Sequence, residues 1–212
     1  MNYILKLILI IVLITLCLTK ITFSKQINII ILGDSLIAGY GLLENDGFVK
    51  QLEKKIQFTN DKVTFVNGGV SGETSYGLRS RLNWVMEDNF DGVVIATGSN
   101  DALRGISTIT IKNNIDFILN KLKSLNIPSM LIGMRAPENM GTQYVNSFNE
   151  IYPSLSKKYK TNFYPFFLLD VALKPKLNQK DMLHPNKEGV KKIVKNISPS
   201  ILTFIESIKI ND

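Results

Sequence analysis

Ser35 lies in the turn Gly33-Asp34-Ser35, directly after a mostly apolar, β-prone run from Ile27 to Leu32. A side chain at the end of a buried strand is held rigidly and projects into a crevice, which is a suitable position for a nucleophile. The same turn would also serve as an ordinary strand-to-helix connection with Ser35 as the helix N-cap. The turn alone leaves both interpretations open.

His184 is the single histidine of the chain, and Asp181 stands three residues before it. A serine hydroxyl is a weak nucleophile near neutral pH and needs an adjacent base, for which imidazole is the common choice. Asp181 is close enough, within a tight turn, to accept a hydrogen bond from the far ring nitrogen and so to fix the tautomer. The alternative is a solvated histidine ring in the first turn of a helix. Neither motif is decisive by itself, but together they predict a serine nucleophile with its base.

Acyl transfer also needs hydrogen-bond donors aimed at the developing oxyanion. Gly72, in the glycine-rich segment 67–74, permits close approach of the backbone and an exposed N–H. Asn100 follows another apolar run and offers a side-chain amide, and the backbone N–H of Ser35 would be the third donor. The other interpretations are a plain glycine-rich turn and an Asx-type turn or cap at Asn100.

The elements that must position these residues alternate between short apolar runs and helical periodicity. We expect strands at Ile27–Leu32, Val63–Val66, Gly92–Thr97, Ser129–Gly133 and Asn162–Pro165. Apolar residues at helical spacing predict helices over 111–125 and over 190–208, the second disturbed at Pro199, and weaker patterns indicate helices at 47–56, 75–86 and 141–159. This alternation predicts an α/β fold with a mostly parallel sheet of about five strands and helices on both faces. Since the carboxyl ends of parallel strands share one edge, the loops that carry Ser35, Gly72 and Asn100 can meet the segment that carries His184.

The first two dozen residues do not belong to that core. Lys6 precedes an apolar block from Leu7 to Ile14, which suits a secretory signal better than a membrane span of about 20 apolar residues. We expect a signal peptide over residues 1–24, cleaved after Ser24, and one domain over 25–212; a retained membrane anchor is the alternative. The single cysteine, Cys17, leaves with the signal, so the mature chain is expected to use neither a disulfide nor a thiol nucleophile.

The formal net charge of the 212-residue chain is +7, and its excess cations are scattered lysines. Nucleic-acid binders favour clustered arginine with interleaved aromatic residues, so no nucleic-acid partner is expected. Weak contact with an anionic membrane surface is compatible with this charge. We expect a monomer without metal or organic cofactor, exported to the periplasm or the medium.

Four sequence blocks resemble those of the SGNH hydrolases, also called the GDSL esterase/lipase family. They are Gly33-Asp34-Ser35, the glycine block around Gly72, Gly98-Ser99-Asn100-Asp101 and Asp181-Met182-Leu183-His184-Pro185, in the order of the family. Within it, the chain is most similar to the bacterial arylesterase, acyl-CoA thioesterase I and lysophospholipase group. Ser99 is a departure, because many relatives in that group have a second glycine there.

The resemblance implies a three-layer α/β/α sandwich of flavodoxin-like kind and a set of roles. Ser35 would be the nucleophile, His184 the base and Asp181 its orienting partner, while Gly72 and Asn100 would complete the oxyanion hole with the Ser35 amide. Ala136 and Pro137 lie in a segment that resembles the loop flanking the acyl pocket, so substrate contact is expected there.

We therefore expect a serine hydrolase of carboxylic esters or thioesters, acting on aryl esters, short- to medium-chain esters, acyl-CoA or lysophospholipids through an acyl-enzyme. Two alternatives stay open. One is a carbohydrate O-acetyl esterase with the same triad. The other is an exported binding protein without catalysis, whose Gly- and Ser-rich rim cradles an anion.

Overall fold

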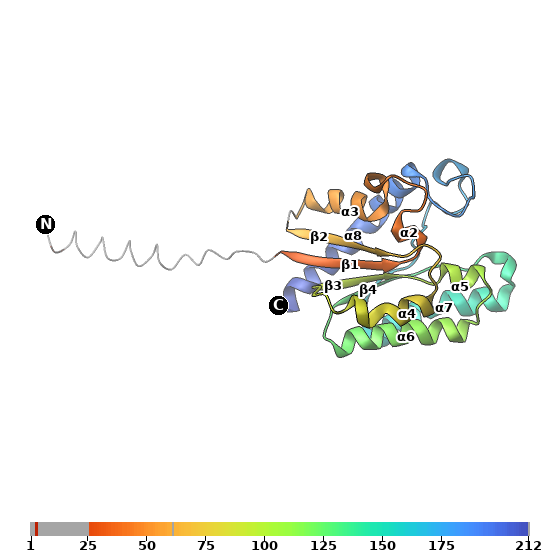
Figure 1. Cartoon of the computed structure of the whole chain (residues 1–212), viewed down its shortest axis with the longest axis horizontal. Coiled ribbons are helices and arrows are strands. Elements are labelled where there is room, and N and C mark those ends of the chain that lie inside the picture. Colours follow the sequence, from red (N-terminus) through yellow and green to blue (C-terminus); the bar gives the residue numbers. More distant parts are fainter. Residues whose placement is uncertain (1–2, 4–25, 61, 212) are drawn as a thin grey trace.

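The computed structural model describes Tyr3, residues 26–60 and residues 62–211 (Figure 1). Apart from Tyr3, the expected signal segment lies outside the described residues. Within the described part of the chain, no helix has the length and apolar character needed to cross a membrane.

The centre of the fold is a five-stranded sheet whose strand pairings are all parallel. The strands are β1 (Ile27–Gly33), β2 (Val63–Gly69), β3 (Gly92–Ala96), β4 (Ser129–Ile132) and β5 (Asn162–Tyr164). Their spatial order is β2-β1-β3-β4-β5, which is the flavodoxin-like order. The chain order reverses between β1 and β3, so the carboxyl ends of these two strands flank the position where such folds bind ligands. Ser35 follows β1 and Asn100 follows β3.

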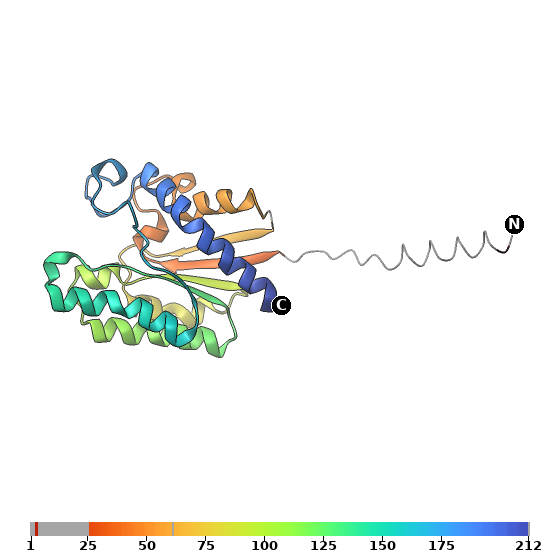
Figure 2. The ribbon, with the colours of Figure 1, turned by 180° about the vertical axis from the view of Figure 1, so that it is seen from behind.

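Two layers of helices cover the sheet and complete an α/β/α sandwich (Figures 1 and 2). One layer contains α3 (Phe48–Gln57) and α8 (Lys187–Asn211), which pack together; the other contains α4 (Ser75–Val85), α6 (Thr108–Ser124) and α7 (Thr142–Tyr159). The expected α/β sandwich is confirmed. The predicted strands and long helices all exist, with ends that differ from the predicted ones by up to three residues.

The short elements were not predicted. They are the helices α2 (Ser35–Ala38) and α5 (Ser99–Leu103) and the 3-10 turns η1 (Glu44–Asp46), η2 (Glu138–Met140) and η3 (Pro175–Leu177). One helical turn is too short to show an apolar period. The disturbance expected at Pro199 does not interrupt α8, whose assignment continues through it. The buried side chains of Ile197, Ile201 and Phe204 hold both halves of that helix against the core.

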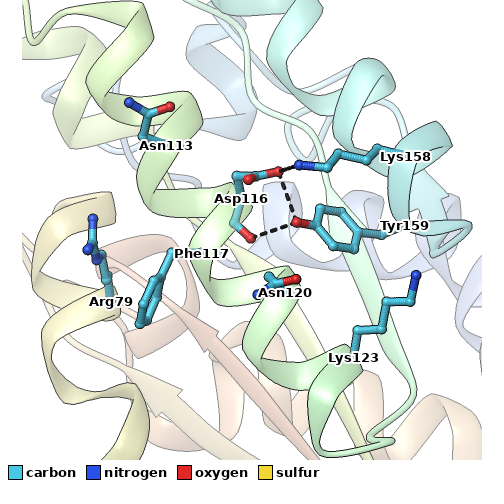
Figure 3. Close-up of a pocket in the computed structure, with 8 residues that line it drawn as sticks. All are labelled: Arg79, Asn113, Asp116, Phe117, Asn120, Lys123, Lys158 and Tyr159. Atoms are coloured by element: carbon cyan, nitrogen blue, oxygen red, sulfur yellow. Dashed lines mark hydrogen bonds and ion pairs between the residues drawn. The ribbon is translucent and has the colours of Figure 1, made fainter.

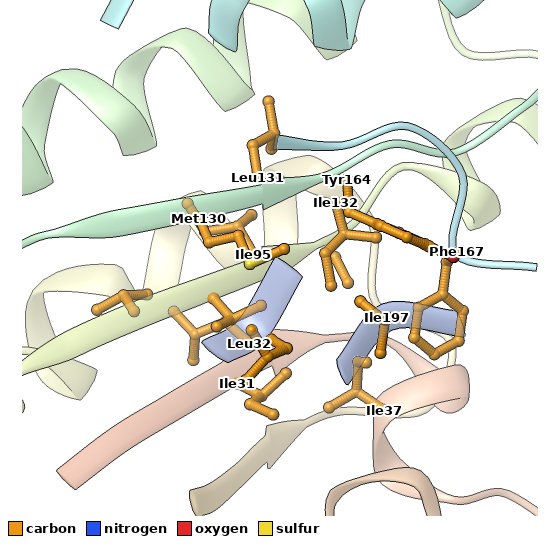
Figure 4. Packing of buried hydrophobic residues seen from close by; sticks show 14 of the residues in the cluster. Ile31, Leu32, Ile37, Ile95, Met130, Leu131, Ile132, Tyr164, Phe167 and Ile197 are labelled. Carbon is orange, nitrogen blue, oxygen red and sulfur yellow. The ribbon is translucent and has the colours of Figure 1, made fainter. Parts of the chain in front are cut away.

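The core lies on both faces of β1, β3 and β4, where almost every side chain is buried (Figure 4). Strands covered on both faces read as continuous apolar runs rather than as alternating ones, as Ile29–Leu32 and Val93–Ala96 do. Ile37 of α2, two residues after Ser35, belongs to the same buried cluster as Ile31 and Leu32 of β1 (Figure 4). The core therefore anchors both sides of the turn that carries Ser35.

Gly69, at the end of β2, is required for the close approach of α2. A Cβ at this position would lie 2.3 Å from the backbone nitrogen of Ala38 and 2.8 Å from the carbonyl carbon of Ile37. Since backbone cannot yield as a flexible side chain does, Gly69→Ala should lower the free energy of unfolding by about 2 kcal/mol, measured by urea denaturation. Gly47→Ala is the matched control, because the nearest atom there is 3.3 Å away. An equal loss in the two variants would contradict the expectation.

Candidate active site

Ser35 is the first residue of α2, and the N-cap of this helix is Asp34. The Asp34 carboxylate accepts the Leu36 backbone N–H at 3.0 Å through Oδ1. The alternative in which the Ser35 hydroxyl caps the helix is therefore wrong. The cap is supplied by the preceding side chain, which leaves the serine hydroxyl free for another partner.

That partner is His184. The distance from Ser35 Oγ to His184 Nε2 is 2.9 Å, and His184 Nδ1 lies 2.7 Å from Asp181 Oδ2. Because an ionised Asp181 can only accept, Nδ1 carries the proton of a neutral ring and Nε2 is left to accept from the serine hydroxyl. The ring is only 19% exposed, so it is not the solvated side chain of the alternative interpretation.

Asp181 holds His184 by hydrogen bonds to the backbone as well as to the imidazole ring. Its Oδ1 accepts the N–H groups of Leu183 at 2.9 Å and His184 at 3.0 Å. The hydrogen bonds from the His184 backbone and ring, and that from Leu183, lower the pKa of Asp181 to about 2. The carboxylate is thus ionised throughout the range in which imidazole acts as a base.

This lowered pKa predicts a pH dependence of stability. A carboxyl group whose pKa is lower in the folded than in the unfolded state stabilises the fold above the unfolded value, here 3.8, and loses that contribution as the pH falls through about 2. The thermal unfolding temperature of Asp181→Asn should therefore lie below that of the wild type at pH 5 to 7, and the difference should shrink towards pH 2. The side chain is 37% exposed, so solvent screening keeps the difference small. A difference that grows on acidification would contradict this.

The segment that carries Asp181 and His184 is tied to the loop after α2. Gln179 donates through Nε2 to the Tyr40 carbonyl at 2.8 Å and to the Pro185 carbonyl at 3.0 Å. The Tyr40 ring packs on the His184 ring with centroids 4.6 Å apart. These contacts bring the two distant parts of the chain together at the carboxyl edge of β1.

Two of the expected oxyanion donors are available backbone groups. Within the described chain, neither the Ser35 N–H nor the Gly72 N–H has a hydrogen-bond acceptor. Gly72 has φ of +79°, a left-handed conformation that favours glycine, and its carbonyl accepts from Arg104 Nη2 at 2.9 Å. The arginine fixes the peptide plane that follows Gly72, while the Gly72 N–H belongs to the preceding peptide and has no acceptor among the described residues.

Asn100 lies on α5, between the loops that follow β1 and β2. Its Nδ2 donates to the Glu73 carbonyl at 3.1 Å and, more weakly, to Asp34 Oδ2 at 3.3 Å. The Ser99 hydroxyl donates to the same Asp34 oxygen. The N-cap of α5 is Gly98, so the capping interpretation of Asn100 is wrong, and the amide instead links three loops.

Two polar clusters behind these loops were not found from the sequence. Glu73 pairs with Arg81 at 2.6 and 2.8 Å, and Arg81 also donates to the Gly68 carbonyl at 2.6 Å. The buried Asp101 accepts from the backbone N–H of Ser75 at 2.8 Å and from its hydroxyl at 2.5 Å. These contacts fix the start of α4 against α5. In the sequence only Glu73 and Asp101 stand out, as acidic residues within the motifs. Their partners Arg81 and Ser75 lie on α4, so the pairings cannot be read from the motifs alone.

Ala136 and Pro137 lie between β4 and η2. Ala136 is buried, and its backbone N–H donates to Asn149 Oδ1 at 3.2 Å, while Pro137 is partly buried. The hydrogen bond ties this loop to α7. Substrate contact by these two residues stays a prediction.

A separate hollow of about 560 Å³ lies over α4, α6 and the end of α7 (Figure 3). Its lining includes Arg79, Phe117 and Lys123, and Asp116 pairs there with Lys158 at 2.6 Å. Arg79 stacks on the Phe117 ring at 4.4 Å, so several of the charged side chains that line the hollow already have partners within it. None of its lining residues belongs to the Ser35 cluster.

The fold and the contact between Ser35 and His184, which lie far apart in the sequence, define a hydrolase of the SGNH type. Comparison with known proteins agrees. The chain belongs to the GDSL-like lipase/acylhydrolase family, whose profile matches residues 31–192. It is an enzyme that hydrolyses ester bonds.

Its similarity extends to characterised relatives. The chain is 35% identical to the thioesterase 1/protease 1/lysophospholipase L1 of Escherichia coli K12 over 76% of this chain and 77% of the relative. It is 31% identical to the arylesterase of Vibrio mimicus over 82% and 86% of the two chains. The structure of the psychrotrophic esterase EstA from Pseudoalteromonas, inhibited by monoethylphosphonate, superimposes with a TM-score of 0.80 at 33% identity, covering 84% of this chain and 98% of that one. The predicted family and subgroup are confirmed.

Proposed function

We propose that the protein hydrolyses carboxylic esters or thioesters through an acyl-enzyme, with Ser35 as nucleophile, His184 as base and Asp181 as orienting acid. The observation that carries the proposal is the 2.9 Å contact between Ser35 Oγ and His184 Nε2. It joins a hydroxyl that lacks any capping role to a base whose far nitrogen is held by an ionised carboxylate.

Each half-reaction follows from these contacts. Ser35 Oγ attacks the acyl carbon while its proton passes to His184 Nε2, and the resulting imidazolium is stabilised by Asp181. His184 then gives the proton to the leaving alcohol or thiol as the bond to the acyl carbon breaks. In the second half, His184 takes a proton from water, which attacks the acyl-enzyme, and returns it to Ser35 as the acid leaves.

The tetrahedral intermediate needs donors for its oxygen. The backbone N–H groups of Ser35 and Gly72 support this role because no acceptor in the described chain uses them. The Asn100 amide is the third donor, and one of its two N–H groups is held by the Glu73 carbonyl.

The surroundings of the cluster support an apolar acyl substrate. Tyr40, Leu43, Val70 and Leu183 are exposed apolar residues, and they lie on the loops that carry or contact Ser35, Gly72 and His184. Relatives named thioesterase, lysophospholipase and arylesterase support the same range of esters. Such a rim also supports weak contact with a membrane surface.

The proposal includes export. Residues 1–24 are proposed as a signal peptide and residues 25–212 as the hydrolase domain, which acts as a monomer in the periplasm or the medium. Cleavage and oligomeric state are tested by the intact mass and the elution volume of protein recovered from the cell envelope or the medium. An intact mass that still includes residues 1–24 would refute cleavage.

Labelling with a fluorophosphonate probe separates an esterase from a binding protein. We expect stoichiometric attachment to Ser35, located by peptide mass spectrometry, because phosphonates react with activated serines. Unlabelled protein that still binds anions would support the binding alternative. A hydrolysis panel of acetyl to long-chain acyl groups, as oxygen and sulfur esters, would then define the substrate, and activity confined to acetylated sugars would favour the O-acetyl esterase.

A further inference from the structure

Asp34 is a buried carboxylate beside the candidate nucleophile. It has no solvent-exposed surface, and its Oδ1 is occupied by the Leu36 backbone N–H at 3.0 Å. Its Oδ2 faces two donors, the Ser99 hydroxyl and the Asn100 amide. A buried carboxylate oxygen without a hydrogen-bond donor destabilises the fold, so Oδ2 must accept a hydrogen bond from one or both of these groups.

The two donors do not share this oxygen equally. The Asn100 amide donates to Asp34 Oδ2 over 3.3 Å, a long and therefore weak hydrogen bond, whereas the Ser99 hydroxyl is the nearer donor. Asn100 has two N–H groups, and one of them is engaged by the Glu73 carbonyl at 3.1 Å. Whether the second is available therefore depends on what else satisfies Asp34.

We infer that Ser99 is a positioning residue for catalysis: its hydroxyl supplies the main hydrogen bond to Oδ2 of Asp34, so the second N–H of Asn100 is held there only weakly and can turn to the oxyanion. The inference rests on the proposed function, since it needs Asn100 as an oxyanion donor. It assigns a role to a side chain that makes no hydrogen bond to Ser35, His184 or Asp181 within the described part of the chain.

Removing the Ser99 hydroxyl has a specific consequence in this arrangement. Burial raises the pKa of Asp34, and the hydrogen bond from Ser99 opposes that rise. Without it, the carboxylate would draw the Asn100 amide from its long 3.3 Å contact into a shorter and stronger hydrogen bond. The amide would then have both N–H groups firmly engaged and none for the substrate.

The first test is the kinetics of Ser99→Ala with a p-nitrophenyl ester. We expect kcat to fall about tenfold with little change in KM, a fraction of the loss caused by removing an oxyanion donor outright. Ser99→Thr keeps the hydroxyl and should recover most of kcat. An Ala variant with the kcat of the wild type, or a Thr variant no better than Ala, would overturn the inference.

The second test is a double-mutant cycle with Asn100→Ala, with active enzyme counted by fluorophosphonate titration. If Ser99 acts through the Asn100 amide, adding Ser99→Ala to Asn100→Ala should change kcat less than about twofold. Two effects that multiply would show that Ser99 acts independently and would overturn the inference. Failure of the proposed function is recognised separately, because an active Ser35→Ala variant would refute the serine mechanism whatever the cycle shows.

Discussion

Ser35→Ala should abolish hydrolysis of p-nitrophenyl butyrate, with kcat at least about 10⁴-fold below that of the wild type. The reason is that the hydroxyl forms the acyl bond itself, and no other described side chain is paired with His184 Nε2. The fold should persist, because the helix cap is Asp34 and not the lost hydroxyl. The assay is initial-rate kinetics on purified protein, with thermal unfolding to show that the variant is folded.

Ser80→Ala is the matched control. Its hydroxyl donates to the Tyr76 carbonyl within α4 and faces solvent, so the same atom is removed from a place without chemistry. This variant should hydrolyse the ester as the wild type does. A folded Ser35→Ala protein with wild-type turnover would refute the assignment of the nucleophile.

His184→Ala should be nearly as damaging, with a loss of kcat of about 10⁴-fold or more. Nothing else at the site can remove the serine proton, because the Asp181 carboxylate contacts the far side of the ring at Nδ1. Initial rates are measured at saturating ester for the variant and the wild type.

The control for His184→Ala is its reaction with the fluorophosphonate probe. A folded variant should label far more slowly than the wild type, since the probe needs an activated serine as the ester does. A variant that keeps a tenth or more of the wild-type turnover would refute the role of the base. Unchanged labelling would assign the activation of Ser35 to another group.

The central sheet could be predicted because β1, β3 and β4 are buried on both faces and leave continuous apolar runs in the sequence. The long helices could be predicted for the same reason, since their buried faces recur at helical spacing. The helices α2 and α5 could not, because each is about one turn long, too short for its buried face to recur at helical spacing. Pro199 was misjudged because packing of α8 on the core outweighs the one backbone hydrogen bond that proline removes.

At the site, sequence motifs identified the residues that meet, but not what holds them. Ser35, Asp181 and His184 were named from residue type and spacing, and the structure brings their side chains within hydrogen-bond distance. The contact of Ser99 with Asp34 was not anticipated, because it joins loops after different strands. Such contacts depend on the three-dimensional approach of β1 and β3, and a single sequence carries no direct signal for them.

Asp181 binds both the backbone and the ring of His184, so acid and base form one preassembled unit within a few neighbouring residues. Bringing the nucleophile to its base therefore requires a single long-range closure, over the sequence separation of 149 between Ser35 and His184. A protein truncated before Asp181 would lack the whole proton-handling apparatus at once, rather than retaining a partly competent remnant.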